Sequence, residues 1–242
     1  MFCLDNGFVD MEEKHNCKGC SASSNSLFKT LNQEETIFLE NQKSCFIYKK
    51  GDILYKEGSR IQGVFCLNKG VLKIYKTGSD GKEQIVAFAR NGDITGYRSV
   101  LSNEPACTTA EVIQEAEICQ IPANVIIQLV KTNGEFALSL MQLTCRELNQ
   151  ANSFIKDIAQ KTVRERLAEA LLMLEETFGI AEGGHLNITL TREELANIVG
   201  TATESVIRLL SEFKADKIIS MDGKKITLVD KPYIKKLAKS FY

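Results

Sequence analysis

The spacing of apolar residues divides the chain into a strand-rich part and a helical part. Between Cys45 and Ile121, short runs of β-branched and aromatic residues alternate with turns that contain Gly, about one turn every ten residues. This pattern is typical of a small antiparallel barrel or double-sheet roll, and any β-sandwich is the alternative. From Gly134 to about Gln160 the apolar period becomes that of a helix.

The helix predicted for residues 134–160 carries two apolar stripes. The first follows a heptad spacing and comprises Ala137, Met141, Thr144, Leu148, Ala151, Ile155 and Ile158. The second comprises Phe136, Leu140, Leu143 and Phe154. Two stripes on one helix favour a homodimer, in which one stripe faces the partner and the other packs on the helix's own domain. The alternative is a core helix of a monomer.

Four capping boxes predict helix starts elsewhere in the chain, and the last two belong to a pair of short helices. Asn32 with Glu35 and Thr162 with Glu165 begin helices at about 33–41 and 163–178. Near the C-terminal end, the box Thr191–Glu194 begins a helix that Gly200 ends. A second helix should follow at once, because Thr201 and Glu204 have the same spacing.

The second of these short helices has a distinct exposed arc. Its apolar stripe is Val206, Leu209, Leu210 and Phe213, and the opposite arc is Thr203, Glu204, Ile207, Arg208 and Ser211. A hairpin with a turn at Gly223 comes next, so the whole segment predicts a winged helix-turn-helix. The spacing of Glu204 and Arg208 favours an intrahelical ion pair, and the same side chains can read cytosine N4 and guanine O6/N7. An ordinary surface salt bridge is the alternative.

The charge of the C-terminal segment supports an anionic partner. Residues 200–242 contain nine Lys/Arg and five Asp/Glu, which gives +4, whereas the whole chain has a formal net charge of −1. A basic end on an acidic body is the electrostatic footprint expected for contact with phosphate groups.

The motif T-R-E-E-L-A-x-x-V-G-x-x-x-E-x-V-x-R-x-L, which starts at Thr191, resembles the DNA-binding domain of the cAMP receptor protein/FNR family. The glycine spacing of the strand region resembles that family's cyclic-nucleotide-binding roll. The resemblance implies an α+β chain with an N-terminal cysteine-containing arm, an antiparallel β-roll similar to a jelly roll, a dimerisation helix and a winged helix-turn-helix. The corresponding ranges are 1–25, 26–132, 133–160 and 161–242.

The resemblance also implies roles for residues of the two short helices. Glu204 and Arg208 would read the core of a TGA-type half-site. Flanking bases or phosphates would be contacted by Thr191, Arg192, Thr201, Thr203 and Ile207. Thr203 stands where the cAMP receptor protein has Arg, and Ile207 stands where FNR has Ser. The exact half-site is therefore left open.

The expected ligand position of the roll lacks the groups that hold a cyclic nucleotide. Tyr97 stands where cAMP-binding members have a Glu for the ribose, and the Arg for the phosphate would fall at Ala106 or Cys107. A cyclic phosphate needs a cation, and this loop offers none. The sequence therefore argues against cAMP, and it nominates a different effector pocket at Tyr97, Arg98, Cys107 and Thr108.

The eight cysteines suggest thiols or ligands rather than disulfides, because no export signal precedes them. Cys17, Cys20 and Cys119 resemble part of the ligand set of an FNR-like iron–sulfur cluster, but Ser26 stands at a third position. A cluster or metal site, a thiol redox switch and no role remain three open interpretations. Four others, Cys45, Cys66, Cys107 and Cys145, are expected to be small buried apolar residues.

Composition predicts a soluble globular chain without a membrane span, and the resemblance implies a cytoplasmic regulator. Hydrophobic residues make up 44% and charged residues 25%, and there is no run of about 18 apolar residues. The expected partners are double-stranded DNA, a second copy of the chain and RNA polymerase. Two other classes compete with this prediction: a thiol redox enzyme using Cys17 and Cys20, and a ligand-binding module without a DNA role, which the basic wing disfavours.

Overall fold

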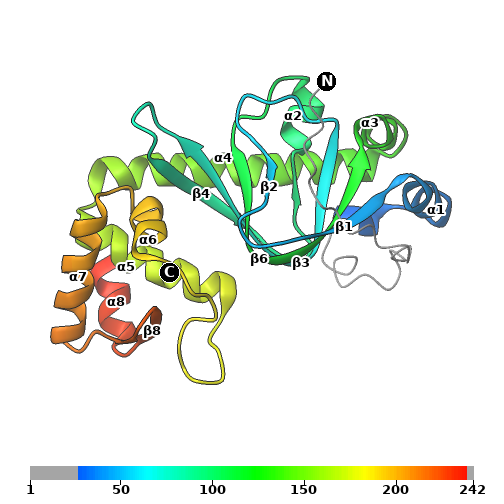
Figure 1. The fold of residues 1–242 in the computed structure, drawn as a ribbon. Helices are drawn as coiled ribbons and strands as arrows, with labels where there is room; N and C mark the ends of the chain where they lie inside the picture. The colour runs from blue at the N-terminus through cyan, green and yellow to red at the C-terminus, as the bar shows by residue number, and fades with distance from the viewer. Residues whose placement is uncertain (1–26, 239–242) are drawn as a thin grey trace, which may run out of the picture. The chain divides into compact units, whose positions relative to one another are not determined.

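The computed structural model describes residues 27–238, which form a mixed α+β fold (Figure 1). In chain order the elements are η2 (Leu27–Thr30), α1 (Gln33–Gln42), β1 (Ser44–Tyr48), β2 (Ile53–Tyr55), β3 (Gly63–Thr77), β4 (Glu83–Ala89), β5 (Ile94–Thr95), α2 (Tyr97–Ser102), β6 (Thr109–Pro122), α3 (Ala123–Thr132), α4 (Gly134–Gln160), α5 (Val163–Phe178), α6 (Arg192–Val199), α7 (Thr203–Ala215), β7 (Ile219–Asp222), β8 (Lys225–Leu228) and α8 (Lys231–Ala238). The predicted fold class is confirmed.

The described chain divides into two compact units. The first contains residues 27–81 and 85–148, and the second contains residues 82–84 and 149–238. α4 is one continuous helix that contributes to both (Figure 1). Two helices that the sequence analysis did not predict, α2 and α3, belong to the first unit.

The sheet of the first unit is antiparallel in each of its resolved pairings and has the strand order β1-β6-β3-β4. β2 also pairs with β6, and β5 with β3. The register between β3 and β6 shifts between Leu67 and Leu72. Gly70 lies at this irregularity with a φ of +103°, and a Cβ there would come within 2.4 Å of the Glu115 carbonyl oxygen. Only glycine allows the two strands to approach this closely.

Two hydrophobic clusters fill the first unit. One lies among the strands and includes Leu72, Ile74, Ala110 and Val112, all at most 6% exposed. The other joins strand residues to helices. It comprises Leu39, Val64, Cys66, Ile94, Tyr97, Cys119, Ile121, Val125, Ile126, Leu129, Phe136 and Leu140. This second cluster fixes the first turns of α4 to the sheet.

α4 has one buried and one uncovered apolar stripe. Phe136 and Leu140 are buried, as the second stripe predicted. The heptad stripe is exposed, since Met141, Leu148 and Ile155 are 59%, 60% and 65% exposed. An apolar stripe of this kind is the feature expected of a helix that packs on another helix.

The second unit holds the predicted winged helix-turn-helix. Val206, Leu209, Leu210 and Phe213 of α7 are buried, and β7 pairs with β8 as the predicted wing. The capping boxes at Asn32, Thr162 and Thr191 are all present. The box predicted at Thr201 is wrong, because Ala202 is the N-cap of α7 and supplies no side-chain hydrogen bond.

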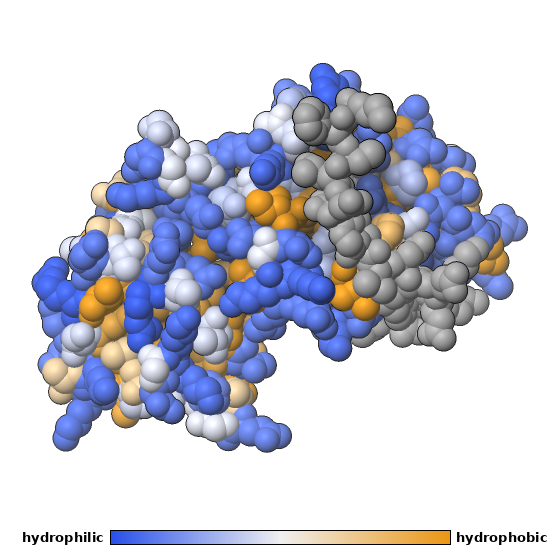
Figure 2. All heavy atoms as spheres, in the orientation of Figure 1, coloured by the Kyte–Doolittle hydropathy of each residue, from blue (hydrophilic) through white to orange (hydrophobic). Residues whose placement is uncertain are grey.

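Among the described residues, no helix has the length and apolar character needed to cross a membrane. The face shown in Figure 2 is largely polar, with apolar residues in small groups.

Candidate nucleic-acid interface and sensory region

The outer face of α7 presents three side chains suited to reading bases. Glu204, Ile207 and Arg208 are exposed, and Ile207 retains 47% of its surface. The spacing of Glu204 and Arg208 predicted an ion pair between them, and this prediction is wrong. Arg208 pairs instead with Glu212, one turn later, with 3.2 Å between Nη1 and Oε1. This contact is solvent-exposed and therefore weak, so the guanidinium can exchange it for another acceptor.

The N-terminus of α7 lacks the side-chain cap that α6 has. Thr191 Oγ1 accepts from the Glu194 N–H at 3.0 Å, whereas Ala202 offers no acceptor to α7. The first N–H groups of α7 are therefore available to an external anion. Thr201 and Thr203 flank this terminus and are half-buried.

Arg192 connects α6 to the wing. Its Nη2 donates to the Gly223 carbonyl oxygen at 2.9 Å, in the turn between β7 and β8. Its Nη1 is buried without a hydrogen-bond partner among the described residues. A buried donor of this kind is costly to leave unpaired, and a phosphate oxygen would satisfy it.

Arg166 of α5 holds the turn between α6 and α7, and sequence reasoning missed it. Its Nε donates to the Val199 carbonyl at 2.9 Å, and its Nη2 donates to the Gly200 carbonyl at 3.3 Å. Gly200 has a φ of +70° and ends α6. The guanidinium thus satisfies carbonyl groups that the helix end leaves without partners.

Arg164, also on α5, positions α7. It forms ion pairs with Glu212 and Asp216 at 2.8 and 3.3 Å, and its guanidinium lies 4.8 Å from the Phe213 ring centre. A sequence signal for both arginines existed. Arg164 and Arg166 lie in the first turn of a helix, where a cation opposes the helix dipole, so each needed a partner elsewhere in the fold.

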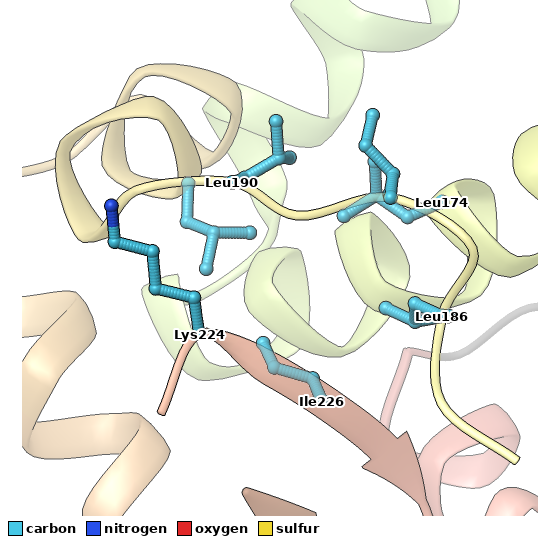
Figure 3. Close-up of a pocket in the computed structure, with 7 residues that line it drawn as sticks. Leu174, Leu186, Leu190, Lys224 and Ile226 are labelled. Carbon is cyan, nitrogen blue, oxygen red and sulfur yellow. The ribbon is translucent and has the colours of Figure 1, made fainter. Parts of the chain in front are cut away.

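The wing contributes positive charge rather than a ligand cavity. Lys224 and Lys225 are exposed at the hairpin. Beside them, apolar side chains of the second unit surround a hollow large enough for about one water molecule (Figure 3). Its lining residues are Leu174, Leu186, Ile188, Leu190, Leu195, Lys224 and Ile226.

The structure places two of the predicted effector-pocket residues against α4. Tyr97 is 2% exposed and lies in the cluster that contains Phe136, so it is a core residue. Burial, and secondarily the neighbouring Glu147, raise the pKa of the Tyr97 hydroxyl far above its ordinary value. Arg98 forms an ion pair with Glu147 at 3.6 Å. These two residues therefore join α2 to α4.

The other two residues of the predicted effector pocket, Thr108 and Cys107, lie in different environments. Thr108 is buried near Tyr55, a residue that sequence reasoning missed, and the Tyr55 hydroxyl is hydrogen-bonded to Thr95. Burial raises the pKa of Tyr55, while the hydroxyl groups of Thr95 and Thr108 act in the opposite direction. Cys107 is exposed. The four residues do not converge on one pocket.

The cation absent from the Pro105–Thr109 loop comes instead from β3. Lys76 Nζ donates to the Cys107 carbonyl oxygen at 2.7 Å and forms an ion pair with Glu57. Ala106, one of the two positions expected for the phosphate-binding Arg, is buried in the strand cluster. Because the Lys76 ammonium group is paired with the Glu57 carboxylate, it is not free to bind a phosphate, and the described loop 105–109 adds no cation of its own.

The cysteines differ from expectation in several ways. Cys45 of β1 and Cys119 of β6 form a disulfide, so the prediction that the cysteines are thiols or ligands is wrong for this pair. The expectation of burial is confirmed for Cys66 and wrong for Cys107 and Cys145, which are exposed.

The disulfide bears on the iron–sulfur interpretation. Cys119, which that interpretation needs as a thiolate, has its sulfur bonded to Cys45. No group of three or more metal-ligating side chains occurs among residues 27–238. Cys17 and Cys20 lie outside the described residues. While the disulfide is intact, Cys119 cannot serve as a cluster ligand.

Comparison with known proteins agrees with this architecture. A model of the cyclic nucleotide-binding domain matches residues 45–133, and a model of the Crp-like helix-turn-helix domain matches residues 165–237. Among solved structures, FixK2 from Bradyrhizobium japonicum is similar, with a TM-score of 0.74 and 25% identity, covering 83% of this chain and 99% of that one.

Curated relatives match over most of their length. The fumarate and nitrate reduction regulatory protein of Vibrio cholerae is 27% identical over 230 residues, which is 92% of this chain and 90% of the relative. The transcriptional activator protein Anr of Pseudomonas protegens is 28% identical over 218 residues, which is 88% of each. A sensory roll of this type, followed by a Crp-like helix-turn-helix and matched by regulators along nearly the whole chain, shows that the chain belongs to the Crp/Fnr family of transcription regulators.

Proposed function

We propose that the chain is a transcription regulator that binds a palindromic site on double-stranded DNA as a homodimer and is switched by a redox signal in its first unit. One observation carries the DNA-binding part of the proposal most directly. The exposed arc of α7 combines a carboxylate, a guanidinium and an apolar side chain at Glu204, Arg208 and Ile207. A recognition helix in the major groove uses these three kinds of group to distinguish bases.

Each side chain of the arc has a chemical preference. Arg208 would leave Glu212 and donate two hydrogen bonds to guanine O6 and N7, while Glu204 would accept from cytosine N4. Ile207 is apolar and exposed, so its best partner is the C5-methyl group of thymine. The half-site should therefore contain a thymine beside the G·C pairs that Arg208 and Glu204 read.

Phosphate contacts would come from the surroundings of α7. Arg192 has a buried Nη1 without a partner, the α7 N-terminus has uncapped N–H groups, and Lys224 and Lys225 project from the wing. Thr191, Thr201 and Thr203 have hydroxyl groups at the same end of the motif. These groups would position the helix without reading sequence.

Dimerisation would use the exposed stripe of α4. Met141, Leu148 and Ile155 follow the heptad spacing and are all more than half exposed in one chain. Burying them against a second α4 removes a continuous apolar surface from water. Two recognition helices related by the dimer axis would then match two half-sites one helical turn apart.

The composition of the roll and the names of the relatives together support a redox-type signal. At the positions expected to hold a cyclic nucleotide, the described roll has Tyr97 in place of the ribose-binding carboxylate and Ala106 or Cys107 in place of the phosphate-binding Arg, so we expect no response to cAMP. Several relatives have names that refer to anaerobic regulation or to fumarate and nitrate reduction. A redox-type signal, a cytoplasmic location and recruitment of RNA polymerase are the matching expectations for this chain.

The first test is selection of a binding site from random double-stranded DNA, followed by competition with non-specific DNA. Arg208→Ala should weaken binding to the selected site by about 1–3 kcal/mol and relax the preference at one base position. Lys225→Ala, the matched control, should weaken specific and non-specific binding alike and reduce the salt dependence by about one phosphate contact. Equal loss of specific and non-specific affinity in Arg208→Ala would contradict the assignment.

A further inference from the structure

Three cysteines occupy one row across three neighbouring strands. Cys119 of β6 is directly opposite Cys45 of β1 on one side and Cys66 of β3 on the other. Residues opposite one another in antiparallel strands point to the same face of the sheet, so all three sulfurs lie on one face. Cys45 and Cys119 are disulfide-bonded, with 4.0 Å between their Cα atoms.

The bonded pair lies at the edge of the sheet. β1 pairs only with β6 among the described strands, so Cys45 is on an edge strand and Cys119 is on its inner neighbour. Cys45 is partly exposed, whereas Cys119 is 5% exposed. The two sulfurs are therefore unequal, and an incoming thiol would reach Cys45 first.

β1, the strand that contains Cys45, is connected to α4 through the packing and hydrogen bonds of α1. Only Lys43 separates β1 from α1, and Leu39 of α1 is buried in the same cluster as Cys119, Phe136 and Leu140. At the other end of α1, the Glu35 carboxylate accepts a hydrogen bond from the side-chain amide of Asn133, which precedes α4. A change in how β1 is held thus reaches the first turn of the dimerisation helix.

Two further contacts join the start of the described chain to the start of α4. Phe28 of η2 stacks on Phe136 of α4, with 5.9 Å between ring centres, and the Asn133 amide also donates to the Thr30 carbonyl oxygen at 3.3 Å. Residues 27–48 therefore form a clamp on the start of α4, and the disulfide fastens the far end of this clamp to β6.

A purely structural role for this disulfide conflicts with the proposed location. In a cytoplasm kept reducing by thiol systems, stable disulfides are rare, and those that form are usually transient and serve redox sensing or catalysis. The chain belongs to a family of regulators rather than enzymes, which leaves sensing.

From these observations we infer that the Cys45–Cys119 disulfide is a reversible redox modification site, which controls the dimerisation helix through the clamp formed by residues 27–48. This inference rests on the proposed function and names its signal: the balance of cellular dithiols and disulfides. It requires no metal and no ligand in the roll.

The chemistry is a balanced two-electron exchange with a dithiol, either a small molecule or a protein. The dithiol's thiolate attacks Cys45 Sγ, the S–S bond breaks, and Cys119 leaves as a thiolate that takes up a proton. The second thiol of the reductant then attacks the mixed disulfide and releases Cys45 as a thiol. The reductant ends as a disulfide and the protein as two thiols, and a disulfide oxidant reverses the sequence.

The site is tested first by mapping the disulfide bonds in peptides of the full-length protein, which is purified without reductant. Thiols are alkylated with one reagent, and thiols released by dithiothreitol are alkylated with a second. We expect the peptides containing Cys45 and Cys119 to be linked before reduction and to carry the second reagent afterwards. Cys107 and Cys145, which are exposed and outside the row, should carry the first reagent. A Cys119 that is unlinked, or linked to a different cysteine, would overturn the assignment.

The effect of the disulfide on α4 and on DNA binding is tested by measuring hydrogen exchange and DNA affinity in both redox states. Reduction should raise exchange in β1, in α1 and in the first turns of α4, and should weaken binding to the selected palindrome about five- to tenfold, a usual size for allosteric coupling. Cys45→Ala should behave as reduced protein with or without dithiothreitol. Cys145→Ala, the matched control, should show the same difference in exchange and DNA affinity between the two redox states as the wild type.

The outcomes separate this inference from the function on which it rests. Wild-type protein that loses the link on reduction without any change in exchange or affinity would show an inert disulfide and refute the switch. Protein that binds no palindrome in either state would refute the proposed function, while peptide mapping and exchange would still decide whether the disulfide controls α4. Both measurements use wild-type protein, so they stand even where Cys45→Ala fails to fold.

Discussion

The side-chain amide of Asn133 donates a hydrogen bond to the carboxylate of Glu35 at 2.8 Å, which joins the capping box of one helix to the start of another. Glu35 also accepts from the Asn32 N–H, and Asn133 Oδ1 accepts from the Phe136 N–H, each at 2.9 Å. One carboxylate and one amide thus satisfy donors at the starts of both α1 and α4. The first turn of α4 is positioned by a segment about 100 residues earlier in the chain.

Asn133→Ala should lower the free energy of unfolding by about 1–2 kcal/mol, because it removes the cap of α4 together with two bonds to residues 30–35. Urea denaturation followed by circular dichroism measures the change. Asn149→Ala replaces an exposed residue on the same helix and should change stability by less than about 0.5 kcal/mol. Equal losses in the two variants would show that Asn133 does not act as a cap.

Features set by residues close in sequence were predictable. The boxes at Asn32, Thr162 and Thr191 each depend on a spacing of three residues, and all three are present. The prediction was wrong at Thr201 because the hydrogen bonds that end α6 include this residue. The Ala196 carbonyl oxygen accepts from the N–H groups of both Gly200 and Thr201. Thr201 therefore belongs to the turn, and Ala202 becomes the cap.

Features set by pairing of distant residues were not predictable. Cys45 and Cys119 are 74 residues apart, and only the register of β1 against β6 brings them together. Lys76 likewise reaches the Cys107 carbonyl from another strand. The choice of Glu212 over Glu204 by Arg208 had a different cause. Both acids are four residues away, and Glu212 is also held in place by Arg164.

Arg166→Ala should destabilise the second unit and weaken specific DNA binding. The substitution leaves the carbonyl groups of Lys161, Val199 and Gly200 without their donor, at a cost of about 2–4 kcal/mol. Arg166→Lys keeps the charge but cannot reach several carbonyls from one planar group, so it should recover only part of the loss.

Thermal unfolding and gel-shift titration would measure both effects. Arg146→Ala removes an exposed arginine from α4 and should leave stability and affinity unchanged. A variant at Arg166 with normal stability and normal affinity would contradict the role of this residue in holding the turn.

Leu148→Glu should convert the dimer to a monomer at micromolar concentration. Leu148 is 60% exposed in the single chain and central in the heptad stripe, and a carboxylate there would be buried against its symmetry mate. Sedimentation velocity would report the change of mass. Gln142→Glu introduces the same charge on an exposed position outside the stripe and should leave the dimer intact.

Tyr97→Phe should reduce the loss of stability at alkaline pH. Burial, followed by the nearby Glu147, raises the pKa of the Tyr97 hydroxyl in the folded chain above its ordinary value of about 10. The unfolded chain therefore releases this proton at a lower pH than the folded chain does. As pH rises past about 10, ionisation of the unfolded state favours unfolding, so the contribution of Tyr97 to stability is complete below that pH and declines above it. Phenylalanine has no proton to lose, and the free energy of unfolding should fall less steeply between pH 9 and about 11.

Below that range the same substitution should cost little. Thr144 and Glu147 of α4 lie near the buried Tyr97 hydroxyl, but no hydrogen bond of normal geometry forms between this hydroxyl and the described residues, so its removal at pH 7 should leave stability unchanged or raise it by about 1 kcal/mol. Guanidinium titrations across the pH range would give both values. Tyr233→Phe alters a tyrosine that is 43% exposed and should follow the wild-type curve. A loss of more than about 1 kcal/mol in Tyr97→Phe at pH 7 would instead mean that the hydroxyl donates a strong hydrogen bond to α4 and that the contact with Glu147 supports the fold.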